Sequence, residues 1–187
     1  MNKWKIALTV LSLGVLLIVA GCAQQNQMSG EQAVVSQAVT VMHPTQGNSV
    51  QGVVTFTKVD NGIRIVADIS GLTPGKHGFH IHQYGDCRAA DGTSAGGHFN
   101  PHNVPHAGPN DTPRHVGDLG NLEADQNGNA HYDRVDQVVA FSGENDIIGR
   151  GVIIHAGEDD LTSQPTGAAG PRVACGVIGV ANPDYGM

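Results

Sequence analysis

Apolar and polar residues alternate over short runs from residue 38 onward, and no convincing helical period accompanies them. Alternation with a period of two is typical of strands that bury one face. Turn signals at Asp60-Asn61-Gly62 and Asn127-Gly128 indicate two hairpins, because tight hairpin turns favour Asn and Gly. The pattern predicts eight strands, at residues 38–42, 50–58, 63–69, 78–83, 118–124, 130–135, 147–154 and 173–180.

Eight short strands favour an all-β domain, built as an antiparallel sandwich or barrel. The composition agrees, since there are 26 glycines and aromatic residues make up only 4% of the chain. Two connections are much longer than the others, from Gly85 to Gly117 and from Ala156 to Pro171. Connections of this length in a small domain are usually functional or disordered. The first one contains four histidines, which favours a functional loop.

The N-terminus has the pattern of a targeting segment. Lys3 and Lys5 precede an apolar run at 6–19, and the small residues Ala20-Gly21 stand before Cys22. This order resembles a bacterial lipoprotein signal, in which the cysteine becomes the lipidated first residue. The alternative is an uncleaved anchor, because the run approaches the length that spans a bilayer. Either way we expect the domain to lie outside the cytoplasmic membrane. The small residues next to the cysteine favour the first interpretation, a lipoprotein anchored through Cys22 to the outer face of the cell membrane.

The predicted organisation therefore has four parts. Residues 1–21 form a lipoprotein-like signal peptide, and the polar segment 22–37 forms a flexible tether. Residues 38–182 form the folded domain, and residues 183–187 form a C-terminal tail.

Charge and cysteine content narrow the function further. The formal charge of −7 argues against a nucleic-acid partner. The cysteines are Cys22, Cys87 and Cys175. If Cys22 carries lipid, an even pair remains in an oxidising compartment, which favours a structural disulfide. The alternative is two unrelated free thiols.

The run Gly78-Phe79-His80-Ile81-His82 falls within one predicted strand. Because strand side chains alternate faces, His80 and His82 project to one side while Phe79 and Ile81 point to the other. The apolar pair suits a core, and imidazole is a good ligand for copper and zinc. Two histidines on one face begin a metal site, so further ligands are expected elsewhere.

The first long loop offers such ligands, with the spacing His98-x7-His106-x8-His115-x2-Asp118. Three imidazoles and one carboxylate make a closed tetrahedral set suited to zinc. A bound ion would also offset the entropy that is lost when so long a loop is ordered. His155, which ends a predicted strand, strengthens the interpretation. His102, in the same loop, is interpreted as a solvated side chain.

Four motifs together carry a family resemblance. They are Gly78-Phe79-His80-Ile81-His82, Gly97-His98-Phe99-Asn100-Pro101, Arg114-His115-Val116-Gly117-Asp118-Leu119-Gly120-Asn121 and Gly170-Pro171-Arg172-Val173-Ala174-Cys175-Gly176-Val177-Ile178-Gly179. In this order they resemble the motifs of copper/zinc superoxide dismutases, and the resemblance covers about residues 38–181. It implies an eight-stranded antiparallel Greek-key sandwich or barrel with two long functional loops, the class that the strand pattern also favours.

The resemblance implies one copper and one zinc per subunit, with the ring of His98 bridging the two metals. The implied copper ligands are His80, His82, His98 and His155. The implied zinc ligands are His98, His106, His115 and Asp118.

The resemblance also assigns supporting roles. Asp159 matches a carboxylate that joins a copper-side and a zinc-side histidine, and such outer partners fix ring orientation. Arg172 matches the arginine beside the open copper position, where it would orient the superoxide anion. His98 is implied as part of the proton path, so Arg172 and His98 are the candidate catalytic residues. Cys87 and Cys175 would form the disulfide that tethers the first loop to the last strand.

The implied activity is dismutation of superoxide to dioxygen and hydrogen peroxide by a redox-cycling copper beside a structural zinc. A second hypothesis is a non-catalytic extracytoplasmic copper-binding or storage protein on the same fold, and a third is a structural or adhesive sandwich. The full ligand set argues against both. Copper-carrying relatives often lack ligand histidines and add a thiol motif such as Cys-x-Cys, which this chain does not have.

Several features depart from the eukaryotic pattern or lie outside the ligand set. Cys87 follows His82 by five residues, and this spacing is similar to that of bacterial members of the family. The sequence of the loop with the candidate zinc ligands looks more like that of eukaryotic members. His77 matches a histidine that bonds to backbone, and His43 and His131 are interpreted as surface residues.

A homodimer is expected, because three stretches match those of the eukaryotic-type interface: Tyr84-Gly85-Asp86, Ile147-Ile148-Gly149 and Gly176-Val177-Ile178-Gly179-Val180.

The charge balance near the site raises a question about anion attraction. Removing residues 1–21 takes away two of the ten cations and none of the 17 acids, so the formal charge becomes −9. The second long loop contains no lysine. Attraction of superoxide must therefore be local. We expect it to come from Arg172, with Arg88 and Arg114 as the nearest spare cations.

Overall fold

The computed structural model describes residues 34–182 and 184–185, and β-strands form the framework of this part of the chain. The predicted signal segment and the lipidation site at Cys22 lie outside the described residues. The strands are β1 (Gln37–Pro44), β2 (Gln51–Val59), β3 (Gly62–Ser70), β4 (Gly75–His82), β5 (Asp118–Ala124), β6 (Ala130–Asp136), β7 (Gly151–His155), β8 (Arg172–Val177) and β9 (Gly179–Val180). One short 3-10 turn, η1 (Thr93–Ala95), interrupts the first long loop.

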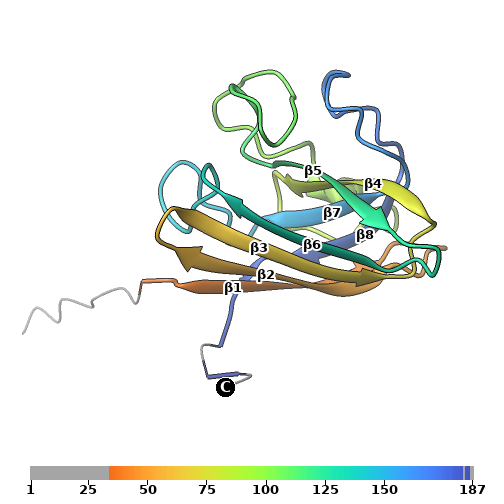
Figure 1. The fold of residues 1–187 in the computed structure, drawn as a ribbon, viewed down its shortest axis with the longest axis horizontal. Helices are drawn as coiled ribbons and strands as arrows, with labels where there is room; N and C mark the ends of the chain where they lie inside the picture. Colours follow the sequence, from red (N-terminus) through yellow and green to blue (C-terminus); the bar gives the residue numbers. More distant parts are fainter. Residues whose placement is uncertain (1–33, 183, 186–187) are drawn as a thin grey trace, which may run out of the picture. The chain divides into compact units, whose positions relative to one another are not determined.

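The strands close into an antiparallel barrel. Their order is β2-β3-β6-β5-β4-β7-β8-β1-β9, and the additional pairing of β1 with β2 closes the ring around eight strands. The chain passes from β3 directly to β4, yet β6 and β5 lie between them, which is a Greek-key connection. The predicted all-β, eight-stranded antiparallel class is confirmed (Figure 1).

Both predicted hairpins are present. β2 pairs with β3 through a turn at residues 60–61, and β5 leads to β6 through a turn that contains Gly128. Gly128 has a φ of 78°, a left-handed backbone conformation that glycine adopts without strain. The hairpins bring inward-facing apolar residues together, including Phe56 and Ile65, which are fully buried. Phe79 also lies in this core, with its ring 5.3 Å from that of Tyr132.

Most strand boundaries shift slightly from the prediction, and two predicted strands differ in a way that local contacts explain. The strand expected at 147–154 begins only at Gly151, because residues 147–150 form a turn in which Arg150 N–H donates to the Ile147 carbonyl. The strand expected at 173–180 is divided at Ile178, whose backbone bonds to Gly149 and Arg150 instead of continuing the ladder. In both places apolar residues continue the pattern, while backbone hydrogen bonds outside the ladder end the strand.

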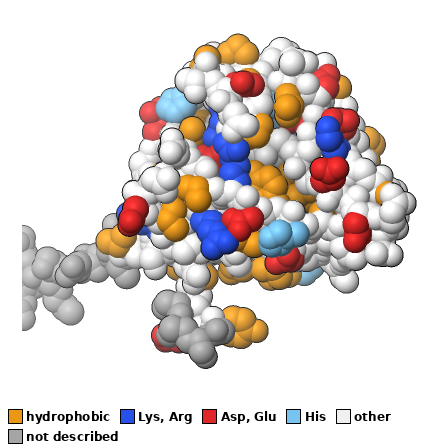
Figure 2. Space-filling model, viewed as in Figure 1, with side chains coloured by type: hydrophobic (Ala, Val, Ile, Leu, Met, Phe, Trp, Pro, Cys, Tyr) orange, Lys and Arg blue, Asp and Glu red, His pale blue; other side chains and the backbone are white. Residues whose placement is uncertain are grey.

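The two long loops are positioned over the same part of the barrel. The first joins β4 to β5 and the second joins β7 to β8, and Figure 1 shows both on the side where these strands lie. Among the residues that the structure describes, no helix is long and apolar enough to span a membrane. On the face drawn in Figure 2, Lys and Arg side chains are interspersed with Asp and Glu.

Candidate metal centre

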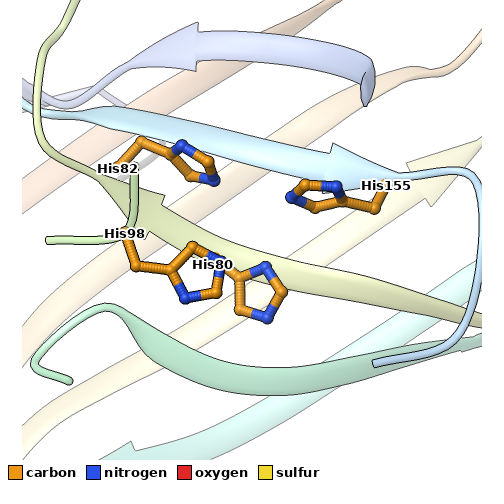
Figure 3. A group of neighbouring side chains, drawn as sticks. All are labelled: His80, His82, His98 and His155. Atoms are coloured by element: carbon orange, nitrogen blue, oxygen red, sulfur yellow. The ribbon is translucent and has the colours of Figure 1, made fainter. Parts of the chain in front are cut away.

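Four histidines converge beside β4 and β7. His80 and His82 stand on β4, His155 ends β7, and His98 reaches them from the first long loop (Figure 3). One ring nitrogen from each lies within 4.8 Å of the others, and all four residues are buried. The alternation along β4 places Phe79 and Ile81 in the apolar core, as predicted.

The unpartnered atoms of this cluster show what it can bind. Six buried side-chain polar atoms of the described residues have no hydrogen-bond partner, and four of them belong to these histidines. A buried polar atom without a partner costs free energy, so such atoms rarely gather by chance. They are His80 Nδ1, His82 Nε2, His98 Nε2 and His155 Nε2. Four imidazole nitrogens with no carboxylate make a donor set that fits copper.

A second cluster surrounds the carboxylate of Asp118. Its Oδ1 lies 2.8 Å from His98 Nδ1, 2.9 Å from His106 Nδ1 and 3.2 Å from His115 Nδ1. Its Oδ2 accepts hydrogen bonds from the backbone of His115 and Ala107, which fixes the carboxylate. Three imidazoles and one carboxylate fit zinc. His98 belongs to both clusters, with Nδ1 on this side and Nε2 on the other.

Asp159 connects the two clusters from the second loop. Its Oδ2 accepts from His80 Nε2 at 2.8 Å and its Oδ1 accepts from His106 Nε2 at 2.9 Å. The side chain of Asn121 holds the backbone of Asp159 at both its N–H and its carbonyl. Each bond takes up the ring nitrogen that faces away from its cluster, so the tautomer that exposes Nδ1 to a metal is selected.

Backbone carbonyls orient three more of the histidines in the same way. His82 Nδ1 donates to Gly96 O at 2.9 Å, and His155 Nδ1 donates to Gly170 O at 2.9 Å. On the other side, His115 Nε2 donates to Val104 O at 3.0 Å. The remaining nitrogen of each ring therefore points into its cluster.

The two clusters differ in protonation. Burial lowers the pKa of His80 to about 3 and that of His155 to about 4, so both rings are neutral at pH 7 and offer a lone pair. Burial also acts on His106, but its hydrogen bonds to Asp118 and Asp159 outweigh it and raise the pKa of His106 to about 9. Without metal, the second cluster thus holds a proton that zinc would displace.

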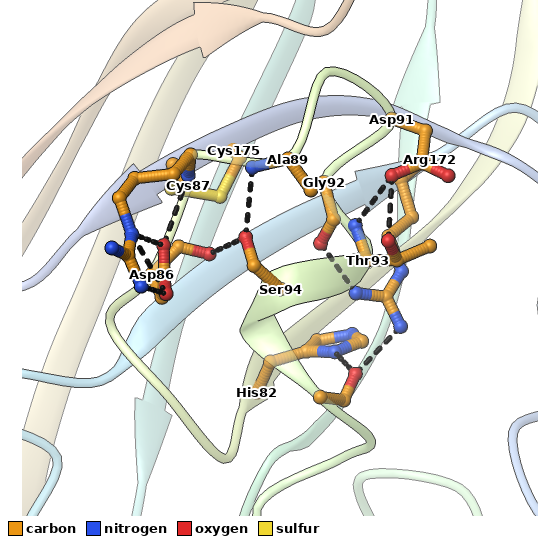
Figure 4. The surroundings of a disulfide bond; sticks show 12 residues. His82, Asp86, Cys87, Ala89, Asp91, Gly92, Thr93, Ser94, Arg172 and Cys175 are labelled. Carbon is orange, nitrogen blue, oxygen red and sulfur yellow. Dashed lines mark hydrogen bonds and ion pairs between the residues drawn. A yellow bond between two sulfur atoms is a disulfide. The ribbon is translucent and has the colours of Figure 1, made fainter.

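Arg172 lies at the edge of the four-histidine cluster. It is half-buried, and its Nη1 and Nη2 donate at 2.6 Å to the carbonyls of Gly92 and Gly96 (Figure 4). Gly96 O is also the acceptor of His82, so one carbonyl positions both side chains. Burial lowers the pKa of Arg172 from its ordinary value, but a guanidinium remains charged at neutral pH.

A disulfide joins the first loop to the barrel. Cys87 and Cys175 are bonded across a separation of 88 residues, with their Cα atoms 5.8 Å apart. Cys175 lies on β8, three residues beyond Arg172, and Figure 4 shows the bridge and the arginine on either side of the loop segment that contains Ala89, Gly92 and Ser94. The tether therefore limits the movement of the segment that supplies Gly92 and Gly96.

The structure corrects one expectation about charge. Arg114 is not a spare cation, because its side chain is buried, pairs with Asp136 and donates to the carbonyls of His115 and Asp118. Arg88 is exposed but pairs with Asp86. The other histidines lie as expected: His77 bonds to the carbonyls of His155 and Thr73, while His43, His102 and His131 are exposed.

Two residues that the sequence analysis did not single out, Arg134 and Gln164, also hold the first loop. Arg134 of β6 donates to Asn110 and to the carbonyl of Pro109, and it lies beside Asp136. Gln164 of the second loop bonds to the backbone of His106. No local signal could have found them, since each acts on a partner more than twenty residues away.

A comparison with known proteins decides the family. A model of copper/zinc superoxide dismutases (SODC) matches residues 50–178. The chain belongs to this family. It is 47% identical over 154 residues to the extracellular Cu-Zn superoxide dismutase of Brugia pahangi, covering 77% of this chain and 76% of that protein. It is 42% identical over 181 residues to the extracellular Cu-Zn superoxide dismutase of Drosophila melanogaster, covering 91% and 97%.

The chain is also similar to a solved structure. The crystal structure of the clock protein EA4 matches with a TM-score of 0.73 and 43% identity, covering 79% of this chain and 96% of that one. The copper and zinc expected for a copper/zinc superoxide dismutase fit the two donor sets described above.

Proposed function

We propose that the protein dismutes superoxide at a copper site formed by His80, His82, His98 and His155, next to a zinc site formed by His98, His106, His115 and Asp118. One observation carries the proposal: four buried, unpartnered imidazole nitrogens converge on one point, and the ring of one of them also belongs to the adjoining set. The family and the named relatives support the same activity.

Copper, when bound, supplies the one-electron redox change that dismutation requires. In the overall reaction one superoxide is oxidised to dioxygen, and a second takes up an electron and two protons to give hydrogen peroxide. Arg172 binds and orients the anion, because its guanidinium is a fixed positive charge at the edge of the cluster. On His98, Nε2 is the atom that would hold and release a proton whenever copper does not occupy it, because Nδ1 belongs to the zinc side and Nε2 has no hydrogen-bond partner among the described residues.

The direct test is metal content together with superoxide consumption by the purified protein. We expect one copper and one zinc per chain and catalytic turnover of superoxide. A copper store would bind the metal without turnover, and this outcome would exclude the enzyme. The two results separate the leading proposal from the alternative on one preparation.

We also propose that the domain acts outside the cytoplasm as a lipoprotein attached through Cys22. Two relatives named as extracellular enzymes support the compartment, and the disulfide suits an oxidising environment. The residues Val19-Ala20-Gly21 before Cys22 support the anchor. Replacing Cys22 by Ser should release the protein from the membrane fraction and abolish labelling by a fatty-acid analogue. Unchanged membrane association would point to an uncleaved anchor.

A homodimer is the proposed assembly. The three stretches expected to form the interface lie side by side: Gly85 is tightly packed against Gly149 and Val177, and the backbones of Gly149 and Ile178 are hydrogen-bonded. Nearby, Val41 of β1 and Val53 of β2 face each other in register, and both are exposed. Exposed valines on adjacent strands are suited to a two-fold apolar contact. Sedimentation of the soluble domain should give twice the chain mass, and Val41→Lys should give a monomer.

A further inference from the structure

The tip of the second long loop (156–171) is a closed turn that fixes the position of Gln164. Asp160 N–H donates to the carbonyl of Gly167 at 2.9 Å, and Gly167 N–H donates to the carbonyl of Ser163 at 2.7 Å. The carboxylate of Asp160 accepts from the backbone of Ser163 at 2.7 Å. The turn is held by its own hydrogen bonds, so it presents the Gln164 side chain in one orientation.

The carboxamide of Gln164 binds both backbone polar groups of one residue in the first loop. Gln164 Oε1 accepts from His106 N–H at 2.8 Å, and Gln164 Nε2 donates to the His106 carbonyl at 2.7 Å. The two residues are 58 positions apart in the sequence. His106 lies outside every strand, so these bonds replace the ladder contacts that would hold a strand residue.

The ring of His106 is held from the same loop. Its Nε2 donates to Asp159 Oδ1 at 2.9 Å, whereas its Nδ1 faces Asp118. Of the four polar atoms of His106, three are therefore bound by the second loop, and only Nδ1 is left for the metal set. The second loop contributes no residue to that set, yet it determines where His106 stands.

We propose that Gln164 is a positioning residue for zinc: it fixes the main chain of His106 while Asp159 fixes the ring. The inference rests on the proposed assignment of His106 as a zinc ligand. A ligand held in place before the metal arrives loses less conformational freedom on binding, so zinc dissociates more slowly. The contacts of Gln164 and Asp159 with His106 also connect the proposed zinc site to the second loop. Asp159 is in turn the partner of His80 on the copper side.

The test compares variants of the full chain loaded with both metals. Gln164→Met keeps the length of the side chain and removes both hydrogen bonds to His106, together with the bond from Nε2 to the Thr162 carbonyl. Gln164→Glu keeps only the acceptor for His106 N–H. Thr162→Ala is the matched control, since Thr162 is exposed on the same turn and its hydroxyl bonds only to Asp160. Transfer of zinc to a competing chelator should be about tenfold faster in Gln164→Met, intermediate in Gln164→Glu and unchanged in Thr162→Ala. Copper content should be unchanged in all three.

A spectroscopic signal separates positioning from general stability. Cobalt(II) bound in place of zinc absorbs according to its ligand geometry, so Gln164→Met should shift the cobalt spectrum while Thr162→Ala should not. Wild-type zinc release and spectrum in Gln164→Met would overturn the inference, and so would equal loss of copper and zinc.

The variant His106→Ala tests the assignment of His106 as a zinc ligand separately from the role of Gln164. If His106→Ala releases zinc quickly and Gln164→Met does not, only the role of Gln164 is wrong. If His106→Ala retains zinc as the wild type does, the assignment of the zinc site fails and the inference fails with it.

Discussion

The four-histidine cluster proposed for copper (the copper side) and the cluster around Asp118 proposed for zinc (the zinc side) are built on different parts of the molecule. Three of the four copper-side histidines stand on strands β4 and β7, whereas three of the four zinc-side residues come from the first loop. On the barrel, pairing fixes the neighbours: His80 lies opposite Ile153 and His82 opposite Gly151. A site of this kind is preformed by strand register.

The zinc side depends instead on contacts between distant segments. Asp118 is the only zinc-side residue on a strand, where it begins β5. The loop before it is tied down by the buried Arg114–Asp136 pair, by Arg134, and by Gln164. One barrel thus carries two adjacent sites of different kinds. The copper side is fixed by strand pairing, whereas the zinc side is formed only while the contacts between the loops hold. We therefore expect that losing a residue that belongs to one side alone should spare the other side.

The largest effect should follow from His155→Ala. It removes one copper-side nitrogen and no zinc-side atom. Activity should fall more than about 100-fold, because loss of a direct ligand should exceed the cost of losing an outer partner. Metal analysis should still find zinc. Loss of both metals would show that the two sides are not independent.

Asp118→Ala is the converse change. The three zinc-side rings would lose the carboxylate that they surround, and two backbone N–H groups would lose their acceptor. Zinc content should fall close to zero and the first loop should become susceptible to protease, while copper still binds. Equal copper loss in both variants would contradict the separation of the sites.

Arg172→Gln tests whether the local charge matters. It removes the cation next to the copper side, and Arg88→Gln is the control because Arg88 is exposed and paired with Asp86. Activity should fall about tenfold or more in Arg172→Gln, since a charge at a site raises the local concentration of an anion. The change in Arg88→Gln should be small. Similar losses would mean that attraction is spread over the whole surface.

Arg134→Gln should weaken the zinc side without touching a metal-binding atom. Its two charge-assisted bonds to Asn110 and Pro109 contribute about 1–2 kcal/mol to the folded loop, less than a buried pair because the side chain is partly exposed. Arg64→Gln is the control, since the Arg64–Asp133 pair is exposed and screened by solvent. Denaturant unfolding of the metal-free protein should show the larger loss for Arg134→Gln. A larger loss of stability for Arg64→Gln than for Arg134→Gln would exclude a stabilising role of Arg134 in the first loop.

The last prediction concerns how the stability of the metal-free protein depends on pH. The folded pKa of His80 and His155 is about 3 and about 4, below the unfolded value of ~6.5, so their contribution is present above pH ~6.5 and is lost as the pH falls. The folded pKa of His106 is about 9, so its contribution is present below pH ~6.5 and is lost as the pH rises through about 9. The thermal midpoint should therefore peak near pH ~6.5. A midpoint that rises steadily to alkaline pH would contradict the proton held on the zinc side.

Local patterns predicted much of the fold. Alternation located the strands, and Gly128 and the Asn-Gly signals located the hairpins. The start of β7 and the end of β8 could not be predicted. Ile147, Ile148 and Ile178 are apolar and fully or partly buried, yet they lie outside the ladder. Burial explains their hydrophobicity, and hydrogen bonds to residues elsewhere decide where the strand stops.

The sequence by itself determined the chemistry of the site. Alternation put His80 and His82 on one face of a strand, and the loop spacing supplied three imidazoles and a carboxylate. Both features follow from the order of the residues along the chain, because successive side chains on a strand point to opposite faces. Only the tertiary structure decided which side chains hold that chemistry in place. Arg114 became a buried partner of Asp136, and Gln164 met His106 across 58 residues, because loop closure brings together groups that no local pattern relates.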